Sequence, residues 1–324
     1  MLDATVVIPA IQVETLVERC VRECARTCGD ADIVVVLDHD EGVERLQGKA
    51  TSLVSGPVTI AAKRNLAARV SAAEFVAFID SDAYPETGWL ENAIGLLRAN
   101  ESLGAVGGPN VSPHEQTNSE RVVGFALRSV LVTGLGNFRK TIQPARLVTD
   151  LPSCNLIVRR TEYLNMGGMN ESLFTGEDMD FCRRLVARGR QILYSPDVLV
   201  YHKNRDLKSF VKQRLTFGSS VFRLLNESLE LDFFVLLLPA AFILFLFSAP
   251  LALVWPLWAW VYSTIIAIYA IAVVTEAFRQ SESLRFFPGT LLAIVIGNLL
   301  PGVGTIANFL NLLPDLRKIY RNDH

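Results

Sequence analysis

Apolar strand patterns alternate with amphipathic helix patterns along the first 200 residues of the chain. The strand patterns are Val6–Ile8, Ile33–Leu37 and Phe75–Ile79, and the helix patterns cover about residues 12–27, 60–71 and 88–99. This alternation predicts an α/β fold in which a mostly parallel sheet is wound with helices. Because ligands of such sheets bind beyond the carboxyl ends of the strands, polar residues at those ends are the first candidates for a functional site.

The pattern changes to one long apolar run in the C-terminal part of the chain. No Asp, Glu, Lys or Arg occurs from Phe233 to Thr275. A membrane-crossing helix needs about 20 apolar residues. The run therefore predicts two transmembrane helices, about 233–252 and 256–275, joined by a short turn that contains proline. A third apolar stretch, about 286–313, is rich in glycine and proline.

Basic side chains indicate on which side of the membrane the connecting segments lie. Residues 203–223 carry six basic groups against one acidic group, and further basic residues lie in the loop 276–285 and in the tail after residue 313. Because positively charged loops stay on the cytoplasmic side, we expect all three there. The third apolar stretch would then re-enter the membrane, hinged at Pro301-Gly302, and leave by the same face. A third crossing with the tail outside is the alternative.

Composition supports a division of the chain into parts. Half of the 324 residues are hydrophobic and 20% are charged, with a net charge of −2, which excludes a disordered chain. The chain opens on the first strand pattern without a signal-peptide pattern, so we expect its first domain on the cytoplasmic face of the cell membrane. We predict an α/β domain over residues 1–202, a basic amphipathic interface region over 203–231 and a multi-pass membrane domain over 232–324.

The five cysteines favour a reducing compartment over a disulfide framework, because their number is odd and the chain is large. Cys20, Cys24 and Cys28 are spaced four residues apart and therefore share one face of a predicted helix. This spacing allows a metal cluster. Small hydrophobic side chains that pack against the sheet are the better interpretation.

Two carboxylates directly follow the strand pattern Phe75–Ile79. Asp80 and Asp82 are separated by one residue, and paired oxygen ligands at a strand end suit Mg²⁺ or Mn²⁺, which keep positions open for phosphate oxygens. His202 ends another strand pattern and is a candidate third ligand. An acidic surface turn is the alternative. No phosphate loop or dinucleotide fingerprint follows the first strand, which excludes the usual nucleoside-triphosphate and dinucleotide functions of this fold.

Two further segments carry groups suited to phosphate binding and proton transfer. Arg64 lies in a basic pair near the start of the predicted helix 60–71, where its guanidinium could bind a diphosphate in a bidentate manner. A solvated helix face is the alternative. Glu177 and Asp178 follow Gly176 at the start of an acid-rich helix. Such acids often only complement the helix dipole, and they can also serve as a catalytic base.

Taken in order, these segments resemble the inverting family 2 glycosyltransferases, whose catalytic domain has the Rossmann-like GT-A fold. The resemblance covers about residues 3–225. It is carried by the opening strand that ends at Pro9, by Asp38, Lys63-Arg64-Asn65, Asp80-Ser81-Asp82 and Cys154–Arg160, and by Gly176-Glu177-Asp178.

The resemblance implies a role for each of these segments. It assigns the nucleotide-sugar donor to Pro9, Asp38, Arg64, Asp80 and Arg214. It assigns a Mg²⁺ or Mn²⁺ ion to Asp80, Asp82 and His202. It makes Asp178 the catalytic base and places Glu177 beside it, to orient the site or to cap the helix.

One feature of the processive members of this family is absent. These members carry a Gln-x-x-Arg-Trp motif, whereas the corresponding stretch here is Lys212-Gln213-Arg214-Leu215-Thr216-Phe217. The Trp platform that would guide a growing polymer is missing, and two or three membrane segments offer little material for a translocation channel. We therefore expect one sugar to be added per encounter.

The resemblance thus implies a membrane-bound enzyme that moves one sugar from a UDP- or GDP-linked donor to an acceptor hydroxyl or phosphate, with inversion. The membrane segments favour a lipid-linked or saccharide acceptor at the membrane lipid, and they could also pair chains into a homo-oligomer. No nucleic-acid partner is expected. Two alternatives stay open: a nucleotidyltransferase, which would usually show a glycine-rich loop after the first strand, and a catalytically inactive scaffold or nucleotide-sugar-binding membrane protein.

Overall fold

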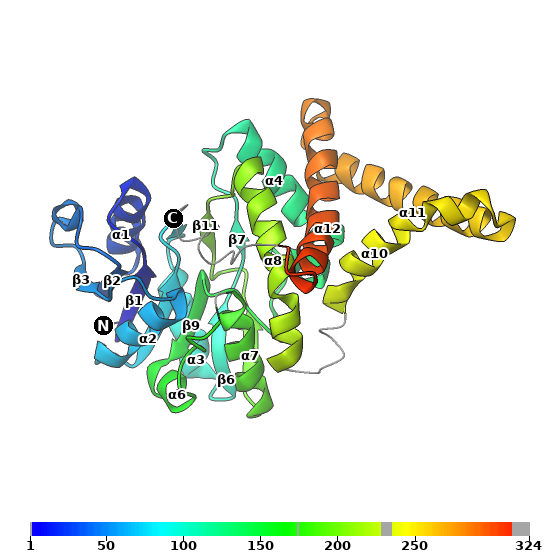
Figure 1. Cartoon of the computed structure of the whole chain (residues 1–324). Coiled ribbons are helices and arrows are strands. Elements are labelled where there is room, and N and C mark those ends of the chain that lie inside the picture. Colours follow the sequence, from blue (N-terminus) through cyan, green and yellow to red (C-terminus); the bar gives the residue numbers. More distant parts are fainter. Residues whose placement is uncertain (1, 174, 228–234, 313–324) are drawn as a thin grey trace. The chain divides into compact units, whose positions relative to one another are not determined.

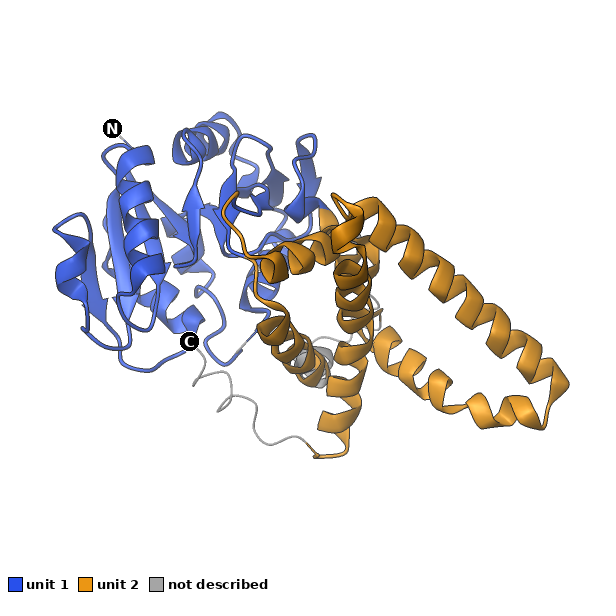
Figure 2. Cartoon of the chain, turned by 90° about the horizontal axis from the view of Figure 1, so that it is seen from above, with its two compact units in different colours: residues 1–113, 138–203 blue, residues 114–137, 204–324 orange. Residues whose placement is uncertain are grey.

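The computed structural model describes residues 2–173, 175–227 and 235–312 (Figure 1). Two compact units make up the chain (Figure 2). The first consists of residues 1–113 and 138–203, and the second of residues 114–137 and 204–324. The segment 114–137 falls within the predicted first domain along the sequence but packs with the C-terminal unit.

The first unit is built on an eight-stranded sheet with the strand order β3-β2-β1-β4-β9-β6-β10-β8. Its strands are β1 (Ala4–Pro9), β2 (Asp32–Leu37), β3 (Thr51–Val54), β4 (Phe75–Ile79), β6 (Leu103–Gly107), β8 (Arg146–Val148), β9 (Asn155–Arg159) and β10 (Gln191–Tyr194). β9 runs antiparallel to β4 and β6, β8 runs antiparallel to β10, and the other pairs are parallel. The predicted α/β fold with a mostly parallel sheet is confirmed, and the three predicted strands are β1, β2 and β4.

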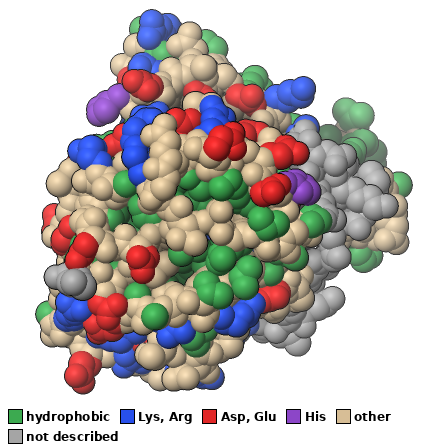
Figure 3. Space-filling view, turned by 90° about the vertical axis from the view of Figure 1, so that its left-hand side faces the viewer, with side chains coloured by type: hydrophobic (Ala, Val, Ile, Leu, Met, Phe, Trp, Pro, Cys, Tyr) green, Lys and Arg blue, Asp and Glu red, His purple; other side chains and the backbone are tan. Residues whose placement is uncertain are grey.

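Helices cover both faces of this sheet (Figure 1). They are α1 (Thr15–Thr27) and α3 (Trp89–Ala99) on one face, and α2 (Ile60–Val70), α6 (Arg160–Asn165) and α7 (Glu177–Ala187) on the other. Side chains along β1 alternate between the two faces of the sheet. Val6 and Ile8 pack into the core under α1 and α3, and Val7 packs into the core under α2, α6 and α7. Charged side chains of both signs are interspersed over the face drawn in Figure 3.

Cys20, Cys24 and Cys28 lie together in the core between α1 and the sheet, all of them buried. This is the packing role that the sequence favoured. Among the described residues, the side chains that converge as metal ligands do not include these three.

A second, three-stranded sheet brings distant segments of the first unit together. It consists of β5 (Ala83–Pro85), β11 (Val200–His202) and β7 (Asn110–Val111), with β11 in the centre. The register pairs His202 with Ala83, the residue that follows Asp82. In the main sheet, the register pairs Asn155 at the start of β9 with Ile79 at the end of β4. The residues just before Asn155 therefore lie beside Asp80.

The second unit is helical. Its elements are α4 (Asn118–Arg128), α5 (Val130–Thr133), α8 (Leu207–Glu227), α10 (Leu238–Phe247), α11 (Pro256–Gln280) and α12 (Phe287–Phe309), with the short 3₁₀ segments η3 (Val235–Leu237), η4 (Ala249–Leu253) and η5 (Leu284–Phe286). Segment 114–137 belongs to this unit because Val123 and Phe125 of α4 share an apolar cluster with Ala293 and Ile294 of α12.

Two helices of the second unit, Pro256–Gln280 and Leu284–Phe309, are long and apolar enough to cross a membrane. One continuous helix was predicted for residues 233–252. The described part of this stretch instead consists of three successive shorter segments, η3, α10 and η4. α10 has 10 residues, which is about 15 Å of helix, or half the hydrocarbon thickness of about 30 Å.

α12 runs unbroken through Pro301-Gly302, so the predicted hinge between two half-helices is not present. Its small residues allow the backbones of neighbouring helices to approach closely. A Cβ atom added to Gly304 would lie 2.2 Å from the Leu215 carbonyl oxygen of α8, and the Thr305 hydroxyl donates to the Gly218 carbonyl at 2.9 Å. The glycines of this stretch therefore serve helix packing rather than a break in the helix.

α10 with η4 and α11 form a hairpin (Figure 2). Aromatic contacts join its two arms, with the rings of Phe245 and Tyr262 4.9 Å apart. Large apolar side chains near its turn face outward: Phe247 is 79% exposed, Leu253 90% and Trp260 76%. Exposed apolar side chains of this kind are typical of regions that bind a partner or a membrane.

Candidate active site

Arg64 links two segments that lie far apart in the sequence. It sits in the first turns of α2, whose Thr59 side chain caps the helix by accepting from the Ala62 amide at 3.2 Å. Its Nη2 donates to Asp80 Oδ1 at 2.6 Å and its Nη1 to Glu177 Oε1 at 2.9 Å. The guanidinium is buried, so it acts as a fixed positive charge between the end of β4 and the start of α7.

His202 faces both strand-end carboxylates. Its Nε2 lies 3.6 Å from Asp80 Oδ2 and 3.5 Å from Asp82 Oδ1. Its Nδ1 lies 2.8 Å from the Lys203 carbonyl oxygen, which can only accept, so Nδ1 carries a proton. A neutral imidazole would therefore direct the Nε2 lone pair at two carboxylates. A proton on Nε2, or a metal cation between these groups, removes that repulsion.

The neighbouring charges also change the pKa values of Asp80 and His202. Burial opposes ionisation of Asp80, but the His202 hydrogen bond and the Arg64 charge outweigh it and lower the pKa of Asp80 to about 2. Burial by itself would lower the pKa of His202, yet the Asp82 charge and the Asp80 hydrogen bond raise it. Asp80 is thus ionised at neutral pH, as a ligand of a hard cation has to be.

Three ligand atoms of the first unit converge closely enough to share one ion. They belong to Asp80, Cys154 and His202, and all lie within 4.8 Å of one another. Asp80 and His202 are two of the three predicted metal ligands, and Asp82 adjoins them through His202. The carboxylate oxygens fit Mg²⁺ or Mn²⁺, and imidazole is a common ligand of divalent transition metals. Cys154 was not predicted as a ligand, because its closeness to Asp80 depends on the pairing of β9 with β4.

Glu177 and Asp178 begin α7, after Gly176 in the left-handed conformation (φ 84°). Asp178 Oδ2 accepts from the Ser153 backbone amide at 3.1 Å, which ties α7 to the segment before β9. Burial and the negative charge of Asp178 raise the pKa of Glu177 to about 7, in spite of the Arg64 charge. Both predicted catalytic carboxylates therefore lie in the site that contains Arg64 and Asp80.

The remaining predicted donor residues lie in different places. Asp38 Oδ1 pairs with Lys63 Nζ at 2.7 Å, and both side chains are buried. Lys63 also donates to the carbonyl oxygen of Ala10, just after Pro9, the last residue of β1. Sequence reasoning did not single out Lys63 for this role, although its place beside Arg64 was the available signal.

Arg214 belongs to the second unit, on α8. Its guanidinium lies over the Phe210 ring, 4.8 Å from the centroid, and its buried Nε has no hydrogen-bond partner among the described residues. Burial lowers the pKa of Arg214 to about 10. Its role in donor binding stays a prediction.

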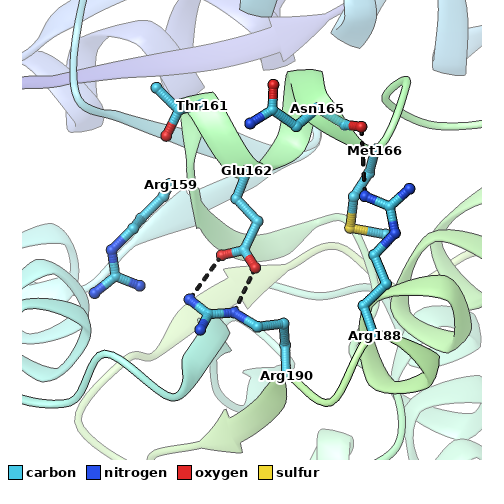
Figure 4. Close-up of a pocket in the computed structure, with 7 residues that line it drawn as sticks. All are labelled: Arg159, Thr161, Glu162, Asn165, Met166, Arg188 and Arg190. Carbon is cyan, nitrogen blue, oxygen red and sulfur yellow. Dashed lines mark hydrogen bonds and ion pairs between the residues drawn. The ribbon is translucent and has the colours of Figure 1, made fainter.

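A separate pocket of about 350 Å³ lies near the opposite end of strands β4 and β9 (Figure 4). The register pairs Arg159, which lines it, with Phe75 at the start of β4, whereas Asp80 follows the end of that strand. Arg190 is paired with Glu162, and Arg188 donates to the Asn165 carbonyl oxygen. Glu162, Arg188 and Arg190 in this pocket therefore already have partners, and the lining does not include the predicted site residues.

Comparison with known proteins finds similarity mainly in the first half of the chain. The family profile described as "Glycosyl transferase family 2" matches residues 5–163. The Pre-mycofactocin glycosyltransferase of Mycobacterium tuberculosis (strain CDC 1551 / Oshkosh) is 32% identical over 169 residues, which are 49% of this chain and 33% of that relative. Glycosyltransferase AglE of Haloferax volcanii is 26% identical over 161 residues, which are 48% of each chain.

This chain therefore spans about a third to a half of the length of these relatives. Among solved structures, the mannosyltransferase PcManGT from Pyrobaculum calidifontis, in complex with GDP-Man and Mn²⁺, has a TM-score of 0.56 at 16% identity, covering 95% of this chain and 87% of that chain. At this identity the likeness concerns the fold. The matched profile identifies residues 5–163, which include the strand-end carboxylates Asp80 and Asp82, as a glycosyltransferase family 2 domain.

Proposed function

We propose that this chain is an inverting, metal-dependent glycosyltransferase that moves one sugar from a UDP- or GDP-linked donor to an acceptor at a membrane. The observation that carries the proposal is the buried Arg64, which bonds to Asp80 at the candidate cation site and to Glu177 at the candidate base. One site thus contains groups for both sides of a sugar transfer. The leaving group needs positive charge, and the acceptor needs a base.

The donor side is proposed to lie at the ends of β4 and β11. Asp80, Asp82 and His202 would hold Mg²⁺ or Mn²⁺, and when bound the cation would neutralise charge on the leaving diphosphate. Arg64 adds a fixed positive charge that is already ordered by its two carboxylates, so little reorganisation is needed when the bond to the sugar breaks. Pro9 and Asp38 would border the nucleotide, and Arg214 is proposed as a second cationic group for the diphosphate.

The acceptor side is proposed to lie at the start of α7. Asp178 would accept the proton of the acceptor hydroxyl, which attacks from the face opposite the leaving group and so inverts the anomeric carbon. The Ser153 amide, 3.1 Å from Asp178 Oδ2, fixes this carboxylate. Glu177 is bound to Arg64 and is proposed to orient that guanidinium.

The second unit is proposed to bring the site to a lipid-linked or saccharide acceptor. Its support is the α10–α11 hairpin, whose Leu253 and Trp260 are 90% and 76% exposed. Burying such side chains in lipid is favourable by about 25 cal/mol per Å². We propose that the hairpin anchors the chain in the cell membrane with the first unit on the cytoplasmic face, and that these segments can also pair chains.

The test is transfer by purified chain in detergent with Mn²⁺ or Mg²⁺, using a panel of labelled nucleotide sugars and a lipid extract as acceptor. We expect a labelled lipid product from the wild-type chain, and loss of at least about 100-fold in rate for Asp82→Asn and Asp178→Asn. Full activity of either folded variant would refute its assigned role. Release of nucleotide from no donor at all would favour the inactive scaffold.

A further inference from the structure

Cys154 faces the candidate cation site from the segment that precedes β9. Its Sγ lies within 4.8 Å of the ligand atoms of both Asp80 and His202, and the residue is only 5% exposed. Carboxylates suit hard cations such as Mg²⁺ and Mn²⁺, imidazole suits transition metals, and a thiolate is a soft ligand. The presence of sulfur therefore changes which ions the site can hold.

We infer that Cys154 is a direct ligand of the cation bound by Asp80 and His202, and that its sulfur adds affinity for thiophilic divalent ions such as Zn²⁺, Co²⁺ and Cd²⁺ to a site whose carboxylates suit Mg²⁺ or Mn²⁺. The inference rests on the cation site of the proposed function and deepens it. On binding, the thiol proton passes to solvent and the sulfur coordinates as a thiolate, so the ion gains one further negative ligand.

The spacing of the ligand atoms suits one such ion. Ligands of a tetrahedral zinc ion lie about 2.0–2.3 Å from the metal, which places them about 3.3–3.8 Å from one another. The Asp80 Oδ2 to His202 Nε2 distance is 3.6 Å. The protonated Nδ1 of His202, held by the Lys203 carbonyl oxygen, leaves Nε2 as the ligating atom. Cys154 Sγ lies within 4.8 Å of the ligand atoms of Asp80 and His202. A side-chain movement of about one ångström would bring the three atoms to the separation found around a tetrahedral ion.

Asn110 forms a hydrogen bond with the Cys154 sulfur. Its Nδ2 donates to Cys154 Sγ at 3.1 Å, and its side chain is 5% exposed with Oδ1 lacking a partner among the described residues. A buried amide that directs its N–H at sulfur stabilises the thiolate form, as hydrogen bonds to metal ligands commonly do. Asn110 lies on β7, directly beside Val200 of β11, so the small sheet positions this donor and His202 together.

The test is titration of the reduced full chain in detergent with Co²⁺, followed by the near-ultraviolet charge-transfer absorption that a thiolate–cobalt bond produces. We expect the band to saturate at one Co²⁺ per chain, to disappear in Cys154→Ser and to persist in Cys28→Ser, a matched variant of a buried cysteine in the core under α1. Competition with a chelator should show that Cys154→Ser weakens Cd²⁺ binding by at least about tenfold while Mg²⁺ binding changes little.

Several outcomes would overturn the inference. One is Co²⁺ binding by the wild-type chain without the band, a result that does not depend on the folding of any variant. Others are a band that survives Cys154→Ser, or equal losses of Cd²⁺ and Mg²⁺ affinity. The band and sugar transfer report separate claims: a band without transfer would count against the proposed function alone, and transfer without a band against Cys154 alone.

Discussion

Arg64→Met removes the positive charge that two carboxylates share and leaves their hydrogen-bonding positions empty. The Arg64 side chain is 2% exposed, Glu177 is 12% exposed and Asp80 is 32% exposed. Removing one partner of a buried ion pair costs about 3–5 kcal/mol. Because water screens part of the Asp80 interaction, we expect the free energy of unfolding to fall by about 3 kcal/mol, a large share of the 5–15 kcal/mol typical of a native protein.

Unfolding of the first unit can be followed through one tryptophan. Trp89 is fully buried, and its Nε1 donates to Asn155 Oδ1 at 2.8 Å. Replacing Trp255, Trp258 and Trp260 of the second unit by Phe leaves Trp89 as the reporter. Urea unfolding of this background and of its Arg64→Met variant, both in detergent, gives the difference in free energy.

Two comparisons make this prediction specific. Arg98→Met breaks the exposed pair with Glu74, in which both side chains are nearly half exposed, and should cost no more than about 1 kcal/mol. Adding Glu177→Gln to Arg64→Met removes a carboxylate left without its partner and should restore about 1–3 kcal/mol. If Arg64→Met costs no more than Arg98→Met, or the second substitution restores nothing, the buried link between β4 and α7 does not stabilise the fold as argued.

Further predictions concern pH and packing. The pKa of Glu177, raised by burial and the Asp178 charge to about 7, exceeds its unfolded value of about 4.3, so ionising it costs about 3–4 kcal/mol. The stability of Glu177→Gln relative to wild type should therefore increase by up to that amount as the pH rises from about 4 to 8 in urea titrations, and a pH-independent difference would refute the argument. Gly218→Val puts a Cβ 1.9 Å from the Pro301 carbonyl oxygen, so thermal unfolding of the second unit should shift down by several degrees. Gly95→Val on α3 of the first unit, with open space around it, should shift thermal unfolding less. Chelating divalent cations should abolish transfer, and added Mn²⁺ should restore it.

Local patterns were sufficient to predict the strands that carry Asp80 and the helix that carries Arg64. β1, β2 and β4 are continuous apolar runs because helices bury both faces of the sheet. The carboxylates follow β4 directly, so their position needs no knowledge of the rest of the chain. What the sequence could not supply is the order of the strands, since β9 enters antiparallel between β4 and β6.

The insertion of β9 accounts for two of the site residues that sequence reasoning missed. Because Asn155 pairs with Ile79, the two residues before it reach the site: Cys154 adjoins Asp80, and the Ser153 amide holds Asp178. Cys154 opens the segment Cys154–Arg160 that carries part of the family resemblance, but the resemblance gives its side chain no role, and Ser153 lies outside that segment. Their roles follow from non-local pairing, which hydrophobic period and spacing do not encode.

The third apolar stretch shows the same limit in the second unit. α11 and α12 have similar mean hydropathy, 2.0 and 1.8 over their most apolar 18 residues. Only 6% of those residues are buried in α11, compared with 44% in α12. The difference comes from the glycines of α12, which bring the backbone of α8 into contact. α8 carries Lys208, Lys212 and Arg214, and charged side chains at the centre of a bilayer cost about 2.5–3.5 kcal/mol each or more. A helix packed along α8 is therefore better suited to the membrane surface than to its interior, which leaves the exposed α10–α11 hairpin as the part of this unit best suited to enter lipid.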